Sequence, residues 1–283
     1  MSGAAAEQGS WRDPATGANM AYRSWRPSSV KALLVLLHGF GEHGGRYESF
    51  ASSLTARGIW VAAPDLPGHG RSGGRRGHIP QPAVCLQQLM TMTNHIFLQA
   101  AGLARYTVFG HSFGGLLAIL WAMQNPPALQ RVILQSPLLE VGFPIPWWKT
   151  SAAQALAGWW PTAAFSTNLD ASALSHDPAV VQGYQTDPLV HHVMTAKTYC
   201  ATLQAKARAC DGTASVRRPV LLLTAGADRI VSVEAARQWF ERLAGEKEHV
   251  AFPGAYHELH HEGACEEVIR LVSGWVLGDE DAR

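Results

Sequence analysis

The sequence predicts an α/β fold in which a mostly parallel, doubly wound sheet forms the core and a mainly helical cap is inserted into the chain. Short aliphatic runs alternate with segments of helical spacing, as expected of β-α-β units. One connection, from Gln135 to Pro219, is much longer than the others. Hydrophobic residues make up 47% of the 283 residues and charged residues 16%, which is a globular composition.

The first predicted element is an antiparallel hairpin at the edge of the sheet. Residues 11–25 hold two short mixed segments around the dipeptides Asp-Pro and Thr-Gly, which favour turns.

The remaining strands are predicted from runs of β-branched or aliphatic residues, because strands buried on both faces of a parallel sheet lack polar alternation. These runs lie at residues 32–37, 59–63, 106–109, 132–134, 220–223 and 249–252. Segments of helical spacing lie at residues 47–56, 84–101, 115–124, 233–243 and 265–276. Their alternation with the strands predicts the doubly wound arrangement.

The long connection predicts the domain organisation. Connections of this length usually carry function, so residues 137–212 are interpreted as the cap, and residues 1–136 and 213–283 as the core. Within the cap, residues 195–209 have helical spacing.

The composition also bears on partners and location. The chain has 23 basic and 22 acidic residues, so no charge excess favours nucleic acid. Residues 1–8 contain no basic segment leading into an apolar one, and the longest aliphatic run, 32–37, is too short to span a bilayer. We therefore expect a cytoplasmic protein. The four cysteines lack CxxC spacing and are expected to be unpaired.

Ser112 is the candidate nucleophile. It is the third residue of the G-x-S-x-G sequence at 110–114, which follows a predicted strand and precedes a predicted helix. A serine on such a sharp turn projects its hydroxyl above the carboxyl edge of the sheet, and the glycines remove side chains that would collide there. The alternative is that Ser112 only caps the helix.

A serine hydroxyl becomes a strong nucleophile only when a base takes its proton, so a histidine and usually a carboxylate must follow. Asp228 lies just beyond the run at 220–223, and His257 lies just beyond the last predicted strand. Their order after Ser112 is the one expected on this kind of sheet. We interpret His257 as the general base and Asp228 as the acid that orients it.

Other residues compete for both roles. Position after the last strand favours His257 over His249, His260 and His261. Glu140 is the alternative acid, because it also follows a strand.

Acyl transfer also needs donors for a developing oxyanion. The backbone N–H of Phe113, the residue after the nucleophile, is one candidate. The His-Gly-Phe-Gly loop at 38–41 follows an early strand and supplies the second, the N–H of Phe40. Its glycines allow the backbone to approach a substrate carbonyl closely.

Through these motifs, the chain resembles the monoacylglycerol lipase and lysophospholipase branch of the α/β hydrolases. The resemblance runs from about residue 20 to 275. The matching stretches are 38–43, 45–47, 65–72, 110–115, 187–189, 226–228 and 254–257. The resemblance implies an α/β-hydrolase fold and hydrolysis of a small acyl ester of glycerol or a glycerophospholipid, with no metal or organic cofactor.

The sequence departs from the commoner family pattern at two positions. Phe113 stands where methionine is frequent, and Phe40 stands where a small residue is also found. Both donors are backbone groups, so the departures leave the mechanism intact. They put in doubt which lengths of acyl chain the site accepts. Glu42, Arg46 and His260 are candidates for a polar group around the triad, with ordinary surface charge as the alternative.

The cap is rich in tryptophan. Trp147, Trp148, Trp159 and Trp160 lie close together among proline and small residues. Because tryptophan favours boundaries between apolar and wet surroundings, one interpretation is a lid that lines an acyl tunnel and transiently contacts a membrane or micelle surface. This would make the protein peripherally membrane-associated. The other interpretation is that these rings form a small core of the cap itself.

Other functions use the same residues differently. Residues 257–261 match H-E-x-x-H, in which His257 and His261 would bind zinc and Glu258 would act as base. A non-catalytic binding protein on the same fold is a second alternative. Within enzymes, a carboxylesterase, thioesterase or peptidase could use the same triad, because pocket and cap decide the substrate.

Overall fold

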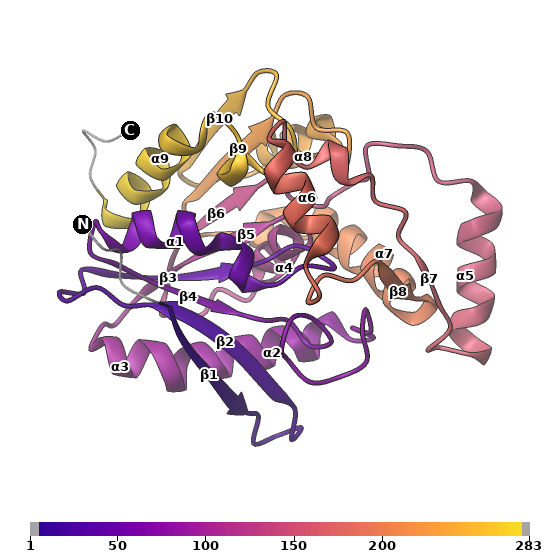
Figure 1. The fold of residues 1–283 in the computed structure, drawn as a ribbon, viewed down its shortest axis with the longest axis horizontal. Helices are drawn as coiled ribbons and strands as arrows, with labels where there is room; N and C mark the ends of the chain where they lie inside the picture. The colour runs from indigo at the N-terminus through magenta and orange to yellow at the C-terminus, as the bar shows by residue number, and fades with distance from the viewer. Residues whose placement is uncertain (1–5, 279–283) are drawn as a thin grey trace.

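A computed structural model of the chain describes residues 6–278, and at its centre lies an eight-stranded sheet of order β1-β2-β4-β3-β5-β6-β9-β10 (Figure 1). The strands are β1 (Glu7–Arg12), β2 (Asn19–Trp25), β3 (Ala32–Leu37), β4 (Ile59–Pro64), β5 (Tyr106–His111), β6 (Leu129–Gln135), β9 (Val220–Ala225) and β10 (Lys247–Phe252). Strand β2 pairs antiparallel with β1 and β4, and the pairs from β4 to β10 are parallel. The predicted edge hairpin and mostly parallel sheet are confirmed.

Strand β6 is longer than its aliphatic run. It begins at Leu129 and not at residue 132, because Gln130 and Arg131 interrupt the run without interrupting the strand. Arg131 donates a hydrogen bond of 2.5 Å to the backbone carbonyl of Trp275 and lies 5.6 Å from the centre of its ring. Contact with the last helix therefore accommodates a polar residue that the hydrophobic pattern could not anticipate.

Helices cover both faces of the sheet, as the alternation predicts. They are α1 (Glu48–Thr55), α2 (Pro82–Met92), α3 (Gln99–Ala101), α4 (Phe113–Met123), α8 (Val233–Glu241) and α9 (Cys265–Leu277), with a π-helical segment at Thr93–Leu98 that joins α2 to α3. One hydrophobic cluster packs α2, α4 and α8 on one face, and a second packs α1 and α9 on the other. Short 3-10 helices lie at Gly44–Tyr47, Thr213–Ser215 and Leu259–His261.

The long connection between β6 and β9 forms mainly helices. It contains α5 (Trp147–Trp159), α6 (Pro178–Thr186) and α7 (Ala196–Asp211), a 3-10 turn at Ala171–Ala173, and the two-stranded sheet of β7 (Ala164–Ser166) and β8 (Val193–Thr195). Helix α5 projects from the rest of the molecule, at the right of Figure 1. The end of α7 packs into the main core through Ala205 and Ala209. The division into core and cap at residues 137–212 stays a prediction.

Two expectations concern location and cysteine pairing. Within residues 6–278, no helix is both long and apolar enough to cross a membrane. Residues 1–5, which make up most of the N-terminal segment without a signal-peptide pattern, lie outside the described residues. All four cysteines are free.

Candidate active site

Ser112 occupies the sharp turn between β5 and α4. Its backbone φ of 52° is in the left-handed region, which is costly for a residue with a side chain. A Cβ on Gly114 would lie 2.1 Å from the carbonyl oxygen of Leu37, and one on Gly110 would lie 2.4 Å from the carbonyl oxygen of Gly114. Both glycines are therefore required sterically, as the G-x-S-x-G sequence predicts.

Asp228 and His257 meet beyond the ends of β9 and β10. Asp228 Oδ2 lies 2.7 Å from His257 Nδ1, and their side chains are 0% and 3% exposed. The other carboxylate oxygen accepts hydrogen bonds from the N–H groups of Ile230 at 2.8 Å and Val231 at 3.0 Å. Because a carboxylate only accepts, the neutral imidazole carries its proton on Nδ1 and keeps a lone pair on Nε2.

The surroundings lower the pKa of Asp228 and raise the pKa of His257. Burial acts to raise the pKa of Asp228, but the His257 charge and the three hydrogen bonds outweigh it and hold that pKa below its usual value of 3.8. Burial acts to lower the pKa of His257, but Asp228, with smaller effects of Glu258 and Glu42, raises it above 6.5. Asp228 is therefore ionised near neutral pH, and His257 is a stronger base than a free imidazole.

Hydrogen bonds at the carboxyl ends of the strands bring this pair close to Ser112. The N–H of Ser112 donates to the carbonyl of Gln135 at 3.1 Å, and the hydroxyl of the next residue, Ser136, donates to the carbonyl of His257 at 3.2 Å. The rings of His111 and His257 have centroids 4.6 Å apart. Three residues far apart in sequence thus lie along one edge of the sheet.

The loop after β3 lies directly beside Ser112. A Cβ built on Gly39 would be in van der Waals contact with the Cβ of Ser112, at 3.5 Å, and would collide with Oε1 of Glu42, at 2.8 Å. The rings of Phe40 and Phe113 make an edge-to-face contact with centroids 5.5 Å apart. Phe40 and Phe113, whose backbone N–H groups are the predicted oxyanion donors, therefore lie next to each other.

Glu42 and Arg46 are buried and support this loop. Glu42 accepts hydrogen bonds from the Gly39 N–H at 2.6 Å and the Tyr47 hydroxyl at 2.8 Å. Its second oxygen accepts from Arg46 Nη1 at 2.7 Å. Burial acts to raise the pKa of Glu42, but Arg46 and the hydrogen bonds lower it. Their burial excludes the alternative of ordinary surface charge for these two residues.

Glu258 completes the ion pairs of Arg46, and sequence reasoning missed this role. Its two carboxylate oxygens accept from Arg46 Nη1 at 2.5 Å and Nη2 at 2.8 Å. His260 is also buried, stacks on Tyr47 with ring centroids 4.3 Å apart, and lies 2.7 Å from Gln135 Nε2 through its Nδ1. No local motif signals the pairing of Arg46 with Glu258, because 212 positions separate them.

The zinc alternative lacks its structural context. Residues 257–261 form a bend and a 3-10 turn and not the α-helix on which H-E-x-x-H presents two histidines. Polar side-chain atoms of Glu258, His260 and His261 do lie within 4.8 Å of one another. However, the Arg46 guanidinium already faces Glu258, so a metal ion bound there would meet a like charge. The donor set therefore does not fit a catalytic zinc site.

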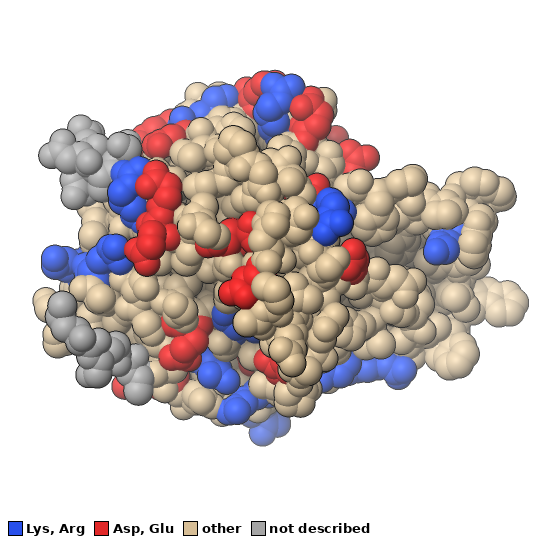
Figure 2. Space-filling model, turned by 45° about the horizontal axis from the view of Figure 1, so that its top comes forward, with Lys and Arg blue, Asp and Glu red and all other residues tan. Residues whose placement is uncertain are grey.

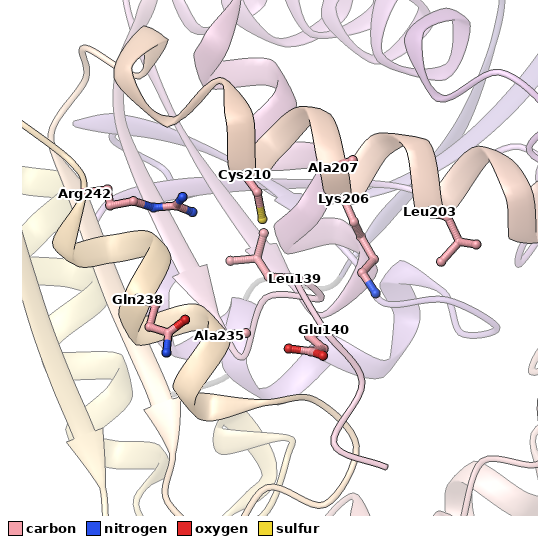
Figure 3. A pocket seen from close by; sticks show the side chains of 9 residues that line it. All are labelled: Leu139, Glu140, Leu203, Lys206, Ala207, Cys210, Ala235, Gln238 and Arg242. Atoms are coloured by element: carbon pink, nitrogen blue, oxygen red, sulfur yellow. The ribbon is translucent and has the colours of Figure 1, made fainter. Parts of the chain in front are cut away.

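Glu140, the alternative acid, is exposed and lines a different space. It borders a cavity of about 450 Å³ between α7 and α8, together with Lys206, Cys210 and Arg242 (Figure 3). The Nδ1 position of His257 is taken by Asp228. The geometry therefore favours Asp228 as the orienting acid.

The tryptophans of α5 and its C-terminal end face solvent. Trp147, Trp148, Trp159 and Trp160 are 79%, 56%, 95% and 63% exposed. The part of the surface that α5 forms is largely free of charged side chains (Figure 2). These rings do not form a core of the cap.

Comparisons with known proteins agree with the fold and with the family that the sequence resembles. A family model described as Serine aminopeptidase, S33 matches residues 28–264. The chain is 30% identical over 264 residues to a monoacylglycerol lipase of Mycolicibacterium smegmatis, which covers 92% of this chain and 94% of that protein. It is 33% identical to an uncharacterized abhydrolase domain-containing protein of Dictyostelium discoideum, with 91% of this chain covered but only 27% of that protein. The solved monoacylglycerol lipase of Paleococcus ferrophilus has a TM-score of 0.81 and 33% identity, and 92% of this chain and 98% of that chain are covered.

Proposed function

The chain belongs to the Serine aminopeptidase, S33 family, in the monoacylglycerol lipase branch of the α/β hydrolases, and we propose that it is a serine hydrolase that cleaves carboxylic esters of the monoacylglycerol type. The observation that carries the proposal is the buried hydrogen bond between Asp228 and His257 beside the strained turn of Ser112. This arrangement supports acyl transfer by a nucleophile, a base and an orienting acid.

In the proposed acylation step, His257 Nε2 takes the proton of the Ser112 hydroxyl as its oxygen attacks the ester carbonyl. Asp228 remains ionised and stabilises the imidazolium that forms. The backbone N–H groups of Phe40 and Phe113 hold the oxyanion of the tetrahedral intermediate. The intermediate collapses when His257 gives its proton to the leaving alcohol, and the acyl group stays on Ser112.

In the proposed deacylation step, His257 takes a proton from water, and the resulting hydroxide attacks the acyl-enzyme carbonyl. The same two N–H groups hold the second oxyanion. Release of the acid returns the proton to Ser112. Every proton is carried by His257, so no metal or organic cofactor is required.

The test combines a substrate panel with a variant. The wild type should hydrolyse monoacylglycerols and p-nitrophenyl esters faster than lysophosphatidylcholine, an acyl thioester or an amino-acid p-nitroanilide. Ser112→Ala should lower kcat by several orders of magnitude while its thermal unfolding temperature stays close to that of the wild type. Retained turnover by this variant would refute the assignment of the nucleophile, and preference for the anilide would identify a peptidase.

We also propose that the exposed tryptophans around α5 contact a lipid surface transiently. Large aromatic side chains at such exposure are unusual on a monomeric protein and favour the boundary between water and lipid. Such a contact would bring the site to a substrate that is poorly soluble in water.

A further inference from the structure

A cavity separate from the candidate active site lies between α7 and α8, and we call it the α7–α8 cavity. Its volume is about 450 Å³, which is in the range of small-molecule binding sites. Within residues 6–278, no member of the triad or the oxyanion loop lines it. Nε1 of Trp239 on α8 donates to the carbonyl of Ala209 on α7 at 3.0 Å, so the two helices are joined directly beside the cavity.

Part of the lining of the α7–α8 cavity is apolar. Leu139, from the connection after β6, is buried, and Leu203 and Ala207 of α7 and Ala235 of α8 complete this surface. A hydrocarbon chain laid against it would lose contact with water, which is favourable for each CH₂ group covered. The apolar lining therefore favours a ligand with a hydrocarbon portion.

Lys206 of α7 lines the cavity and is half-buried. Its ammonium makes no hydrogen bond and no ion pair with residues 6–278. Burial lowers the pKa of Lys206 below its usual value of 10.5, and the attraction of Glu140 and Cys210 offsets this effect only in part. The side chain is still a cation at neutral pH. Because it has lost water without gaining a partner, an anion in the cavity would stabilise it.

A second cation faces the same space. Arg242 directly follows α8, and its guanidinium likewise forms no ion pair and no hydrogen bond in the described part of the chain. The side chains of Lys206 and Arg242 extend from the two helices into the space between them (Figure 3). Glu140 is the one acidic residue among the described residues that line the cavity. Positive charges therefore outnumber negative ones, which favours an anion.

We propose that the α7–α8 cavity binds an organic carboxylate with a hydrocarbon chain, such as the anion of a medium-chain fatty acid. The carboxylate accepts hydrogen bonds from the Lys206 ammonium, and Arg242 adds a second positive charge. The chain lies along the apolar surface that begins at Leu139. This assigns a ligand site to residues that the triad and the oxyanion loop do not use.

Other classes of ligand fit the cavity less well. An alkylammonium ion would cover the apolar surface but would meet two positive charges. A metal ion would meet the same charges and only one carboxylate, Glu140. A small ion such as acetate would satisfy Lys206 but would leave the apolar surface uncovered.

The experiment is isothermal titration of the full chain with octanoate, octan-1-ol, octylamine and acetate. The wild type should bind octanoate most tightly, because only this probe offers both a negative charge and a chain. Acetate should bind at least about tenfold more weakly, since it buries almost no apolar surface. Absence of octanoate binding, or equal binding of octanoate and octylamine, would overturn the proposal.

Two substitutions in the cavity should change the Kd for octanoate in opposite directions. Lys206→Met keeps most of the aliphatic stem and removes the charge, so the Kd should rise roughly tenfold. Glu140→Gln removes the negative charge of the lining, so the Kd should fall by about threefold. Lys197→Met is the matched control, at an exposed lysine of the same helix outside the cavity, and should bind octanoate like the wild type.

The same titration locates the bound carboxylate. A Kd that Lys206→Met and Glu140→Gln both leave unchanged would place octanoate elsewhere on the molecule and overturn the proposal. Titration needs no turnover, so Ser112→Ala should bind octanoate as tightly as the wild type. A wild type that cleaves no ester would refute the proposed function, whereas binding that depends on Lys206 would still support the α7–α8 cavity as a carboxylate site.

Discussion

Asp228 does two things to His257 at once. Its carboxylate fixes the proton on Nδ1 through the 2.7 Å contact, and it raises the pKa of the imidazole against the effect of burial. The first effect leaves Nε2 free to act as a base, and the second increases its basicity. A single buried side chain thus sets both the tautomer and the pH range of the proposed reaction.

Substitution of Asp228 by Asn should therefore change both rate and pH dependence. In the wild type, kcat/KM for a soluble ester should rise with pH through an inflection above 6.5, because the base must be neutral and its pKa is raised. In Asp228→Asn, kcat/KM should fall about 10³- to 10⁴-fold, and the inflection should move to lower pH because burial then dominates. An exposed carboxylate, Asp170, provides the control variant Asp170→Asn. An inflection that stays in place would contradict the assigned acid.

Glu258 should matter for stability because it neutralises Arg46 in a buried position. The side chains of Arg46 and Glu258 are 7% and 2% exposed. Glu258→Gln should lower the free energy of unfolding by about 3 kcal/mol, since a buried charge loses one partner and keeps only Glu42. Urea denaturation followed by circular dichroism measures this change.

The matched control for Glu258 is a carboxylate in an exposed ion pair. Glu267 pairs with Arg270 on α9 at 2.6 Å, where both side chains are more than 40% exposed. Glu267→Gln should change the free energy of unfolding by less than about 1 kcal/mol. Equal effects of the two substitutions would show that Arg46 does not depend on Glu258.

Phe40 should limit which acyl groups fit. Its ring is held by edge-to-face contacts with His69, Phe113 and His191, so it cannot move away without disturbing them. Phe40→Ala keeps the backbone N–H and removes the ring. The preference among p-nitrophenyl esters of increasing chain length should therefore shift toward longer or bulkier acids. An unchanged chain-length profile would place Phe40 outside the acyl site.

At the scale of elements, α5 is the helix whose exposed apolar side chains are least explained by a contribution to folding stability. The helix begins at Trp147, directly after Pro146. Ala153 is the only buried residue among its side chains, while the tryptophans at both ends face solvent. A helix that buries so little of its apolar surface contributes little to folding, which fits a surface used for contact.

Replacing the two most exposed tryptophans should weaken lipid binding. The double variant Trp147→Ser and Trp159→Ser should partition onto phosphatidylcholine vesicles roughly tenfold less than the wild type, because each ring removed loses favourable burial at the interface. Co-sedimentation measures this partition. Leu277→Ser, at an exposed apolar residue of α9, is the control and should sediment like the wild type. Vesicle binding that survives the double substitution would rule out this surface.

At the scale of the whole molecule, buried histidines couple stability to pH. Among the histidines within residues 6–278, burial lowers the pKa of eight wholly or partly buried rings below 6.5, and these are His38, His69, His78, His111, His191, His249, His260 and His261. Below pH 6.5 the unfolded chain protonates these rings while the folded chain keeps them neutral. The unfolded state then binds more protons, so the free energy of unfolding falls as pH falls. His257, with its raised pKa, acts in the opposite direction.

Urea denaturation at a series of pH values checks this coupling. The free energy of unfolding should decrease below pH 6.5 by about 1.4 kcal/mol per pH unit for each net additional proton that the unfolded state binds. A free energy of unfolding that stays constant between pH 7.5 and 5.5 would contradict the neutral state of the buried rings.

The order of strands and helices was readable from the sequence because its signals are local. Aliphatic runs mark β3 and β5 to the residue at which they begin, and the glycines around Ser112 mark a turn that no other residue fits. The positions of Asp228 and His257 follow from the same logic, because parallel strands end at one edge of a sheet. Their catalytic roles stay predictions.

Tertiary structure alone decided the features that join distant residues or depend on solvent contact. Arg46 meets Glu258 across 212 positions, and no local pattern encodes that pair. The exposure of Trp159 and the unsatisfied nitrogen of His69 are properties of the packed molecule, because they depend on which groups fail to reach them. The sequence by itself therefore determined the framework and the candidate triad, whereas packing decided what surrounds the triad, since burial and pairing exist only once the chain has folded.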